Sequence, residues 1–161
     1  NRGIAKKEMG RHEEAIADYD EAVRLDPTDA AAYSNRGTAK GKMGRHEEAI
    51  ADFDEAVRLD PTDAAAYNNR GIAKKKMGCH EKAIADYDEA VRLDPDNAKA
   101  YNNRGIAKKE MGRHEEAIAD FDEAVRLDPT DATAYSNRGT AKEEMGRHEE
   151  AIADYDEAVR L

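Results

Sequence analysis

A unit of about 34 residues repeats almost unchanged along the chain, and this period restricts the possible folds more than any other feature. The triplet Asn-Arg-Gly occurs five times, always at the same spacing. Residues 35–68 and 103–136 differ at only five positions, and no insertion or deletion breaks the phase. A period of this size is typical of architectures in which each unit packs on its neighbours. We therefore expect a stacked array without one central core.

Each unit contains the pattern of two helices joined by a tight turn. We expect a first helix over residues 30–43, with Thr28 or Asp29 as its N-terminal cap, because a short oxygen-bearing side chain can accept from free backbone N–H groups. Gly44 should end this helix, since glycine adopts the left-handed conformation at little cost. We expect a second helix over residues 46–59, which carries an apolar stripe at a spacing of three to four residues and ends at an Asp-Pro pair.

A single helix hairpin cannot bury its apolar faces, so stability must come from contacts between repeats. Gly37 interrupts a predicted helix and recurs in every copy, which indicates close approach of the partner helix. Gly41 stands where the other copies have Lys or Glu, so we expect a mild local weakness there. The chain reads as a piece of a longer array. Its expected parts are a partial repeat at 1–29, repeats at 30–63, 64–97 and 98–131, and a partial repeat at 132–161.

This spacing of side chains resembles the tetratricopeptide repeat (TPR) family along the whole chain. Arg36 and Lys40 depart from the pattern, which usually has leucine and tyrosine there. The resemblance implies an all-α fold: a right-handed superhelical α-solenoid of antiparallel helix hairpins. It also implies that the first helices line a concave face, that the second helices form the convex face, and that the array binds proteins without catalysing a reaction. The matching positions are Tyr33, Gly37, Ala49, Phe53, Ala56 and Pro61.

Charge is divided between the two kinds of helix. The chain has a net charge of −10, which makes nucleic acid or an anionic membrane a poor partner. The first-helix segments sum to +12 and the second-helix segments to −22, so the groove would attract an acidic peptide. Alternatively, Arg36 and Lys40 pair with carboxylates of the second helices and leave a mixed groove. We expect Asp52, Asp54 and Glu55 to lie on a solvated outer face.

An asparagine column is the sharpest candidate for a binding site, because an amide side chain offers a donor and an acceptor to an extended peptide. The column begins at Asn1, and in it the array resembles the asparagine ladder of O-linked N-acetylglucosamine transferase. It lacks the neighbouring lysines of a complete chaperone-tail carboxylate clamp. Structural hydrogen bonding between first helices is the alternative. The predicted groove residues are Asn35, Asn69, Asn103, Asn137, Asn68, Asn102, Lys75, Lys76, Lys99 and Lys109.

Other candidate sites receive little support from the sequence. One histidine per repeat cannot form a tetrahedral zinc site, so His46 and its four copies are interpreted as packing residues at the start of each second helix. No metal, cofactor or catalytic group is predicted, and there is no Gly-rich phosphate loop. Cys79 replaces an arginine of the other copies and is expected at the surface, in a reducing and therefore cytoplasmic setting.

Three functions remain open at this point. The first is a scaffold that binds an extended peptide or partner protein in the groove. The second is a module that stacks head to tail, because the last helix carries Val159 and Leu161 like an interior copy and complementary surfaces of one chain can propagate an assembly. The third is an interaction appendage of an enzyme that lies outside this segment.

Overall fold

The computed structural model describes residues 2–161, so Asn1 of the asparagine column lies outside the described residues. Within that range the chain forms ten helices and no strands, which confirms the expected all-α helical repeat. None of these helices is long and apolar enough to cross a bilayer. The helices are α1 (Arg2–Glu8), α2 (His12–Leu25), α3 (Ala30–Lys42), α4 (His46–Leu59), α5 (Ala64–Lys76), α6 (His80–Leu93), α7 (Ala98–Glu110), α8 (His114–Leu127), α9 (Ala132–Glu144) and α10 (His148–Arg160).

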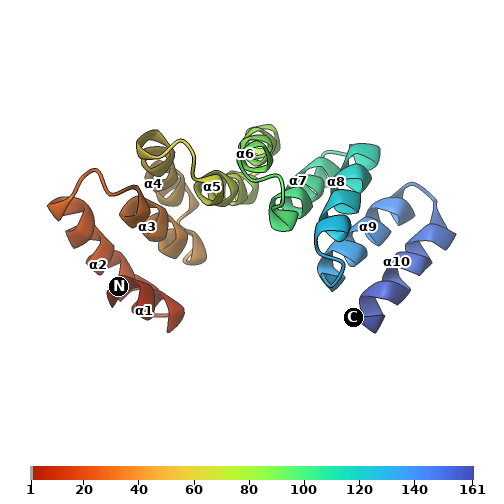
Figure 1. Ribbon diagram of the computed structural model, residues 1–161, viewed down its shortest axis with the longest axis horizontal. Coiled ribbons are helices and arrows are strands. Elements are labelled where there is room, and N and C mark those ends of the chain that lie inside the picture. The colour runs from red at the N-terminus through yellow and green to blue at the C-terminus, as the bar shows by residue number, and fades with distance from the viewer. Residues whose placement is uncertain (1) are drawn as a thin grey trace. The chain divides into compact units, whose positions relative to one another are not determined.

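The helices fall into two compact units, residues 1–79 and 80–161. In the first unit, α1 packs on α2 and α3 packs on α4, while α5 packs on α4 and touches α3. In the second unit, α7 packs on α8 and α9 packs on α10, while α6 packs on α7. Figure 1 shows these antiparallel hairpins within each unit. The odd-numbered helices are the first helices of the repeats and the even-numbered helices are the second.

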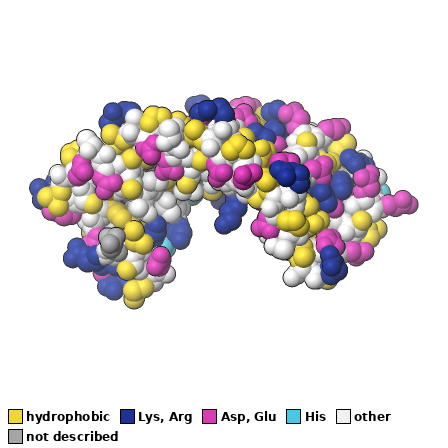
Figure 2. Space-filling model, viewed as in Figure 1, with side chains coloured by type: hydrophobic (Ala, Val, Ile, Leu, Met, Phe, Trp, Pro, Cys, Tyr) yellow, Lys and Arg dark blue, Asp and Glu magenta, His cyan; other side chains and the backbone are white. Residues whose placement is uncertain are grey.

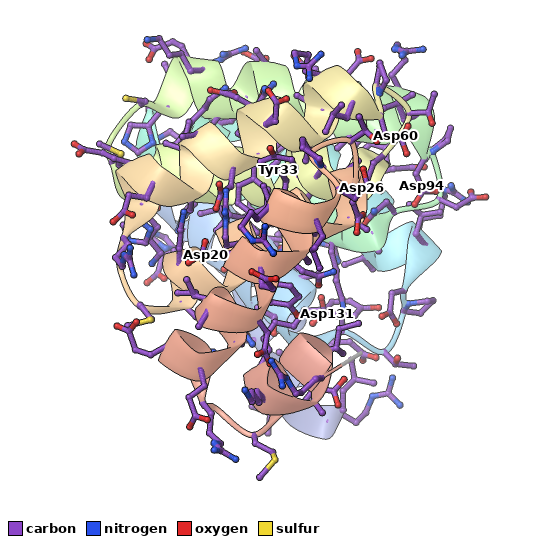
Figure 3. The ribbon with its side chains drawn as sticks, turned by 90° about the vertical axis from the view of Figure 1, so that its left-hand side faces the viewer. Asp20, Asp26, Tyr33, Asp60, Asp94 and Asp131 are labelled. Carbon is purple, nitrogen blue, oxygen red and sulfur yellow. The ribbon has the colours of Figure 1, made fainter. Side chains whose placement is uncertain are left out.

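The ends of the helices follow from their local sequence. Asp29 caps α3, because its carboxylate accepts from the backbone N–H of Ala32 at 3.0 Å. Gly44 follows the end of α3 and has a φ of +76°, a left-handed conformation that glycine adopts at little energetic cost. After α4, the Asp60 carboxylate accepts from the backbone N–H and the hydroxyl of Thr62 at 3.0 and 2.7 Å. Figure 3 shows Asp60 and its equivalent Asp26 at these turns. The prediction of Asp29 as a cap is confirmed.

The core lies inside the hairpins that belong to one unit, where an aromatic ring of the second helix packs on a glycine of the first. Phe53, Tyr87 and Phe121 are the largest fully buried side chains. A Cβ atom placed on Gly37 would lie 3.1 Å from the Phe53 ring and 3.2 Å from the Ala49 carbonyl oxygen. These distances confirm that the recurring glycine permits close approach of the two helices. Gly41 differs, because a Cβ there would meet only the Ala49 Cβ, at 3.8 Å.

Candidate peptide-binding surface

Arg36, Arg104 and Arg138 each form a cluster in which one arginine binds two aspartates. Arg36 donates to Asp52 from Nε at 3.0 Å and from Nη2 at 2.6 Å, and Lys40 contacts the same carboxylate at 2.8 Å. Nη1 of Arg36 donates to Asp20 of the preceding second helix at 2.8 Å. Its guanidinium also lies 5.3 Å from the ring centroid of Tyr33, at cation–π distance. Asp20 and Tyr33 are labelled in Figure 3.

These clusters correct the expectation that Asp52 lies on a solvated outer face. Asp52 is only 5% exposed, because two cations from the adjoining first helix cover and neutralise its carboxylate. Asp54 agrees with the expectation, since its side chain is 57% exposed. Of the two interpretations of the first-helix charge, the structure favours internal pairing for Arg36 and Lys40. Those two side chains are therefore not available to a partner, and only some of the predicted basic surface remains.

The same clusters predict how stability depends on pH. Hydrogen bonds from Arg2 and then from Lys6 lower the pKa of Asp18 to about 2. Burial raises the pKa of Asp154, but hydrogen bonds from Arg138 and Lys142 outweigh it and leave the pKa below its usual value. A carboxyl group with a lowered pKa binds protons less readily in the folded than in the unfolded state, so it stabilises the fold above its unfolded pKa of about 4.

We therefore expect the urea unfolding midpoint to fall steadily as the pH is lowered from about 4 towards 2. The midpoint should change little between pH 5 and 7, because these aspartates are then ionised in both the folded and the unfolded state. Circular dichroism at a series of pH values measures the change, and Asp154→Asn should weaken its pH dependence. A midpoint that stays constant from pH 5 to pH 2 would contradict the expected role of the clusters.

The predicted asparagines do not share one environment. Asn35 donates to the Ala31 carbonyl at 2.9 Å and accepts from Lys7 Nζ at 2.7 Å. Asn137 donates to the Asn102 side chain at 3.0 Å. For Asn35, Asn137 and Asn102, the structure thus shows the alternative role, which is hydrogen bonding within and between first helices. Asn69 is half-buried and has no hydrogen-bond partner among the described residues. Asn68 and Asn103 also form interactions and are not free.

The predicted lysines lie at different ends of their helices. Lys75 and Lys76 occupy the last turn of α5, and Lys75 already has an interaction within the chain. Lys109 lies in the last turn of α7, while Lys99 lies in its first turn. Ten residues of helix separate these two side chains by about 15 Å along the axis. The structure therefore does not bring Lys99 and Lys109 together, whereas Lys76 lines the same pocket as Asn69.

A pocket of about 270 Å³ opens between α3, α4 and α5 in the first unit. Its base includes Gly37, Phe53 and Ala73, and its walls are mostly apolar. The polar side chains at its edge come from both first helices and from the start of α4. They are Thr38, Lys42, His46, Asn69 and Lys76.

The predictions for the histidines and for the cysteine agree with the structure. A histidine is the first residue of each second helix, and Nδ1 of His46 is buried without a hydrogen-bond partner in the described chain. Nδ1 of His80 and of His114 is likewise buried without a hydrogen-bond partner, and it lies 3.3 and 3.2 Å from a carboxylate oxygen of Glu110 and Glu144. Cys79 is a free, exposed thiol.

Two features of this surface were not fully predicted from the sequence, although the repeats contain a signal for each. The pairing of Arg36 and Lys40 with carboxylates was one of two alternatives, but the burial of Asp52 was not expected. Every arginine of the triplet is followed by an aspartate 16 residues later, as with Arg36 and Asp52, and this constant separation could have indicated the clusters. Gly41 was interpreted only as a weak point of a helix. The equivalent position in every other repeat has a long side chain, Lys or Glu. Gly41 lines the pocket, so this difference could have indicated where the pocket lies.

The repeat pattern of a known family matches nearly all of the chain. The family described as "TPR repeat" matches residues 3–44, 41–78 and 75–112, and the one described as "Tetratricopeptide repeat" matches residues 98–131 and 132–161. The chain belongs to the TPR family. It is therefore an all-α helical-repeat solenoid protein of a family that is generally non-enzymatic. No curated protein sequence matches it significantly.

Solved TPR structures have the same fold as this chain. The crystal structure of MamA aligns with a TM-score of 0.90 at 28% identity, covering 99% of this TPR chain and 94% of MamA. A protein titled "YrrB: a TPR protein with an unusual peptide-binding site" aligns with a TM-score of 0.80 at 25% identity, covering 98% and 81%. Pseudomonas aeruginosa pilF, at 20% identity, aligns with a TM-score of 0.90 over 98% of this chain and 72% of pilF; that likeness concerns the fold alone.

Proposed function

We propose that this TPR array is a protein-interaction scaffold that binds an extended peptide or a partner protein against its first helices. The family and the fold support a scaffold. The half-buried amide of Asn69, which has no partner in the described chain and faces the pocket beside α3, is the observation that carries the finer proposal. An amide of this kind can pair with the main chain of a peptide whatever its sequence. YrrB, a TPR protein of the same fold, has a peptide-binding site, which supports peptide binding by this array.

The charge that remains available on the first helices favours acidic peptides. Lys42 and Lys76 are exposed and form no ion pair among residues 2–161. Arginines of the second helices are largely paired with carboxylates three residues away, as Arg58 is with Glu55. Figure 2 shows the resulting surface, on which Lys and Arg side chains lie close to Asp and Glu side chains. Lys82, Lys99 and Lys109 also form no ion pair among the described residues, so what sets Lys42 and Lys76 apart is that they line the pocket beside Asn69.

Peptide selection tests the proposal without knowledge of the natural partner. We expect the wild-type array to enrich sequences from a phage-displayed library of random twelve-residue peptides. Asn69→Ala should lower the affinity of the enriched peptides about 2- to 12-fold, which corresponds to the net contribution of one typical hydrogen bond, about 0.5–1.5 kcal/mol. Asn137→Ala is the matched control, because Asn137 already donates to Asn102. Failure of the wild type to enrich any peptide would contradict the proposal.

Self-association stays a prediction. Ile152 and Val159 on α10 are 58% and 88% exposed, whereas the equivalent Ile118 and Val57 are 7% and 9% exposed. The exposed face of α10 thus has the composition of a contact between repeats. The scaffold remains the proposal that the free asparagine and lysines favour.

A further inference from the structure

The pocket between α3, α4 and α5 depends on Gly41. In the first repeat the equivalent residue is Lys7, whose side chain reaches across the neighbouring first helix and donates to Asn35 at 2.7 Å. Gly41 has no side chain to cover the corresponding gap. Two consequences follow together: a pocket remains above the buried ring of Phe53, and Asn69 is left without a lysine like the one that binds Asn35.

The edge of the pocket is positively charged. Lys42 and Lys76 line it and have no carboxylate within ion-pair distance in the described chain. Burial and then the charge of Lys42 lower the pKa of Lys7, while Glu8 opposes the shift, so Lys7 and Lys42 lie close enough for their charges to interact. A cluster of unpaired positive charges beside an apolar surface favours a ligand that combines an apolar group with a negative one.

At the equivalent place in the second unit, the small residue is replaced by a long one and the two lysines are replaced by acidic residues. The residues equivalent to Gly41, Lys42 and Lys76 are Lys109, Glu110 and Glu144. There the gap carries a long side chain, and the two lysines are replaced by glutamates that lie near His80 and His114. The features of the first unit are therefore not required by the repeat fold, because the same fold forms without them.

We propose that this pocket is a specificity site, which takes one apolar side chain of a bound peptide while Lys42 and Lys76 bind a carboxylate next to it. This inference rests on the proposed function, since it names the kind of peptide that the α3–α5 surface selects. The volume of about 270 Å³ lies just below the usual range for small-molecule pockets, about 300–1,000 Å³, and suits a single side chain. The Asn69 amide then pairs with the peptide backbone beside that side chain.

Substitutions that copy the second unit test the proposal and preserve the fold. Gly41→Lys introduces the residue found at Lys109, and the double change Lys42→Glu with Lys76→Glu introduces those found at Glu110 and Glu144. The probe is the same library of random twelve-residue peptides, followed by fluorescence anisotropy with the enriched peptides at low salt. Circular dichroism and the urea unfolding midpoint check that each variant folds.

The wild-type array should enrich peptides with a Leu, Ile, Met or Phe next to an Asp, a Glu or the terminal carboxylate. Gly41→Lys should weaken their binding about tenfold or more, as expected when a large apolar side chain stays in water. The glutamate pair should replace attraction of acidic residues by repulsion, so the preference for acidic peptides should be lost and added salt should no longer weaken binding. The reverse change Lys109→Gly, which opens a gap with an acidic edge, should not add binding of these peptides.

The outcomes separate the two proposals. Enriched peptides that lack an apolar position, or that bind Gly41→Lys as tightly as the wild type, would overturn the specificity site while peptide binding itself stands. Peptides that lose binding with Asn69→Ala but not with the glutamate pair would overturn the carboxylate contact. The absence of any enriched peptide would overturn peptide binding and the specificity site together.

Discussion

Replacing Asp120 with alanine is expected to lower the free energy of unfolding by about 3–5 kcal/mol, the range for removing one partner of a buried ion pair. Asp120 is 4% exposed and accepts from Arg104 Nε and Nη2 at 3.0 and 2.6 Å. Lys108 contacts the same carboxylate at 2.8 Å. The substitution leaves two cations close together, both mostly buried, with no carboxylate between them. Urea unfolding followed by circular dichroism measures the loss.

The second carboxylate on the same arginine is the matched control. Asp88 accepts from Arg104 Nη1 at 2.8 Å, but its side chain is 57% exposed. Exposed ion pairs contribute about 0–1 kcal/mol, because water screens the charges and already solvates them. Asp88→Ala should therefore cost no more than about 1 kcal/mol. Equal losses for the Asp88 and Asp120 variants would mean that burial does not set the strength of these contacts.

Replacing Gly105 with alanine is expected to destabilise the fold by about 1–3 kcal/mol through overpacking. The added Cβ would lie 2.6 Å from Cε1 of Phe121, closer than carbon atoms can approach. Phe121 is fully buried, so its ring cannot move aside without displacing the core of the α7–α8 hairpin. The clash must exceed the gain of about 0.8–1 kcal/mol that alanine normally brings to a helix interior.

The same substitution at Gly41 should have the opposite sign. Its Cβ would make only an ordinary contact with Ala49, at 3.8 Å. We expect Gly41→Ala to stabilise the fold by about 0.8–1 kcal/mol, the difference in helix propensity. Urea unfolding of the two variants gives the comparison. Stabilisation by alanine at Gly105 would show that the ring of Phe121 can yield, and would contradict the close packing described for each hairpin.

The sequence was sufficient for the features that depend on neighbours along the chain. Helix α4 begins at His46 and ends at Leu59, as expected from its apolar stripe and from the Asp-Pro pair that follows it. Asp29 caps the N-terminus of α3, and Gly44 follows its C-terminal end. Each of these depends on a local rule about backbone hydrogen bonds or allowed angles. The recurring Gly37 also carried its packing role in the sequence, because only close approach explains a glycine inside every first helix.

Features that depend on pairing between helices were harder to predict. Asp52 lies in a charged stretch of a second helix, and such a stretch is usually solvated. Its burial follows from Arg36 and Lys40, which reach it from another helix. The asparagines of the column have different partners for the same reason, since Asn35 accepts from a lysine 28 residues away, whereas Asn137 donates to Asn102. The same residue at the equivalent position of each repeat is therefore not equally free to bind a partner.

The arginine that holds two aspartates has a consequence for how such a chain can change in length. Arg104 binds one carboxylate 16 residues before it and one 16 residues after it, and Arg138 does the same. Recombination that deletes or duplicates one whole repeat in phase within a unit rejoins each guanidinium to an equivalent pair of acids. The gene can thus gain or lose a hairpin without needing a new set of contacts between neighbouring repeats. A single altered copy, such as the one with Gly41, can at the same time acquire its own ligand preference.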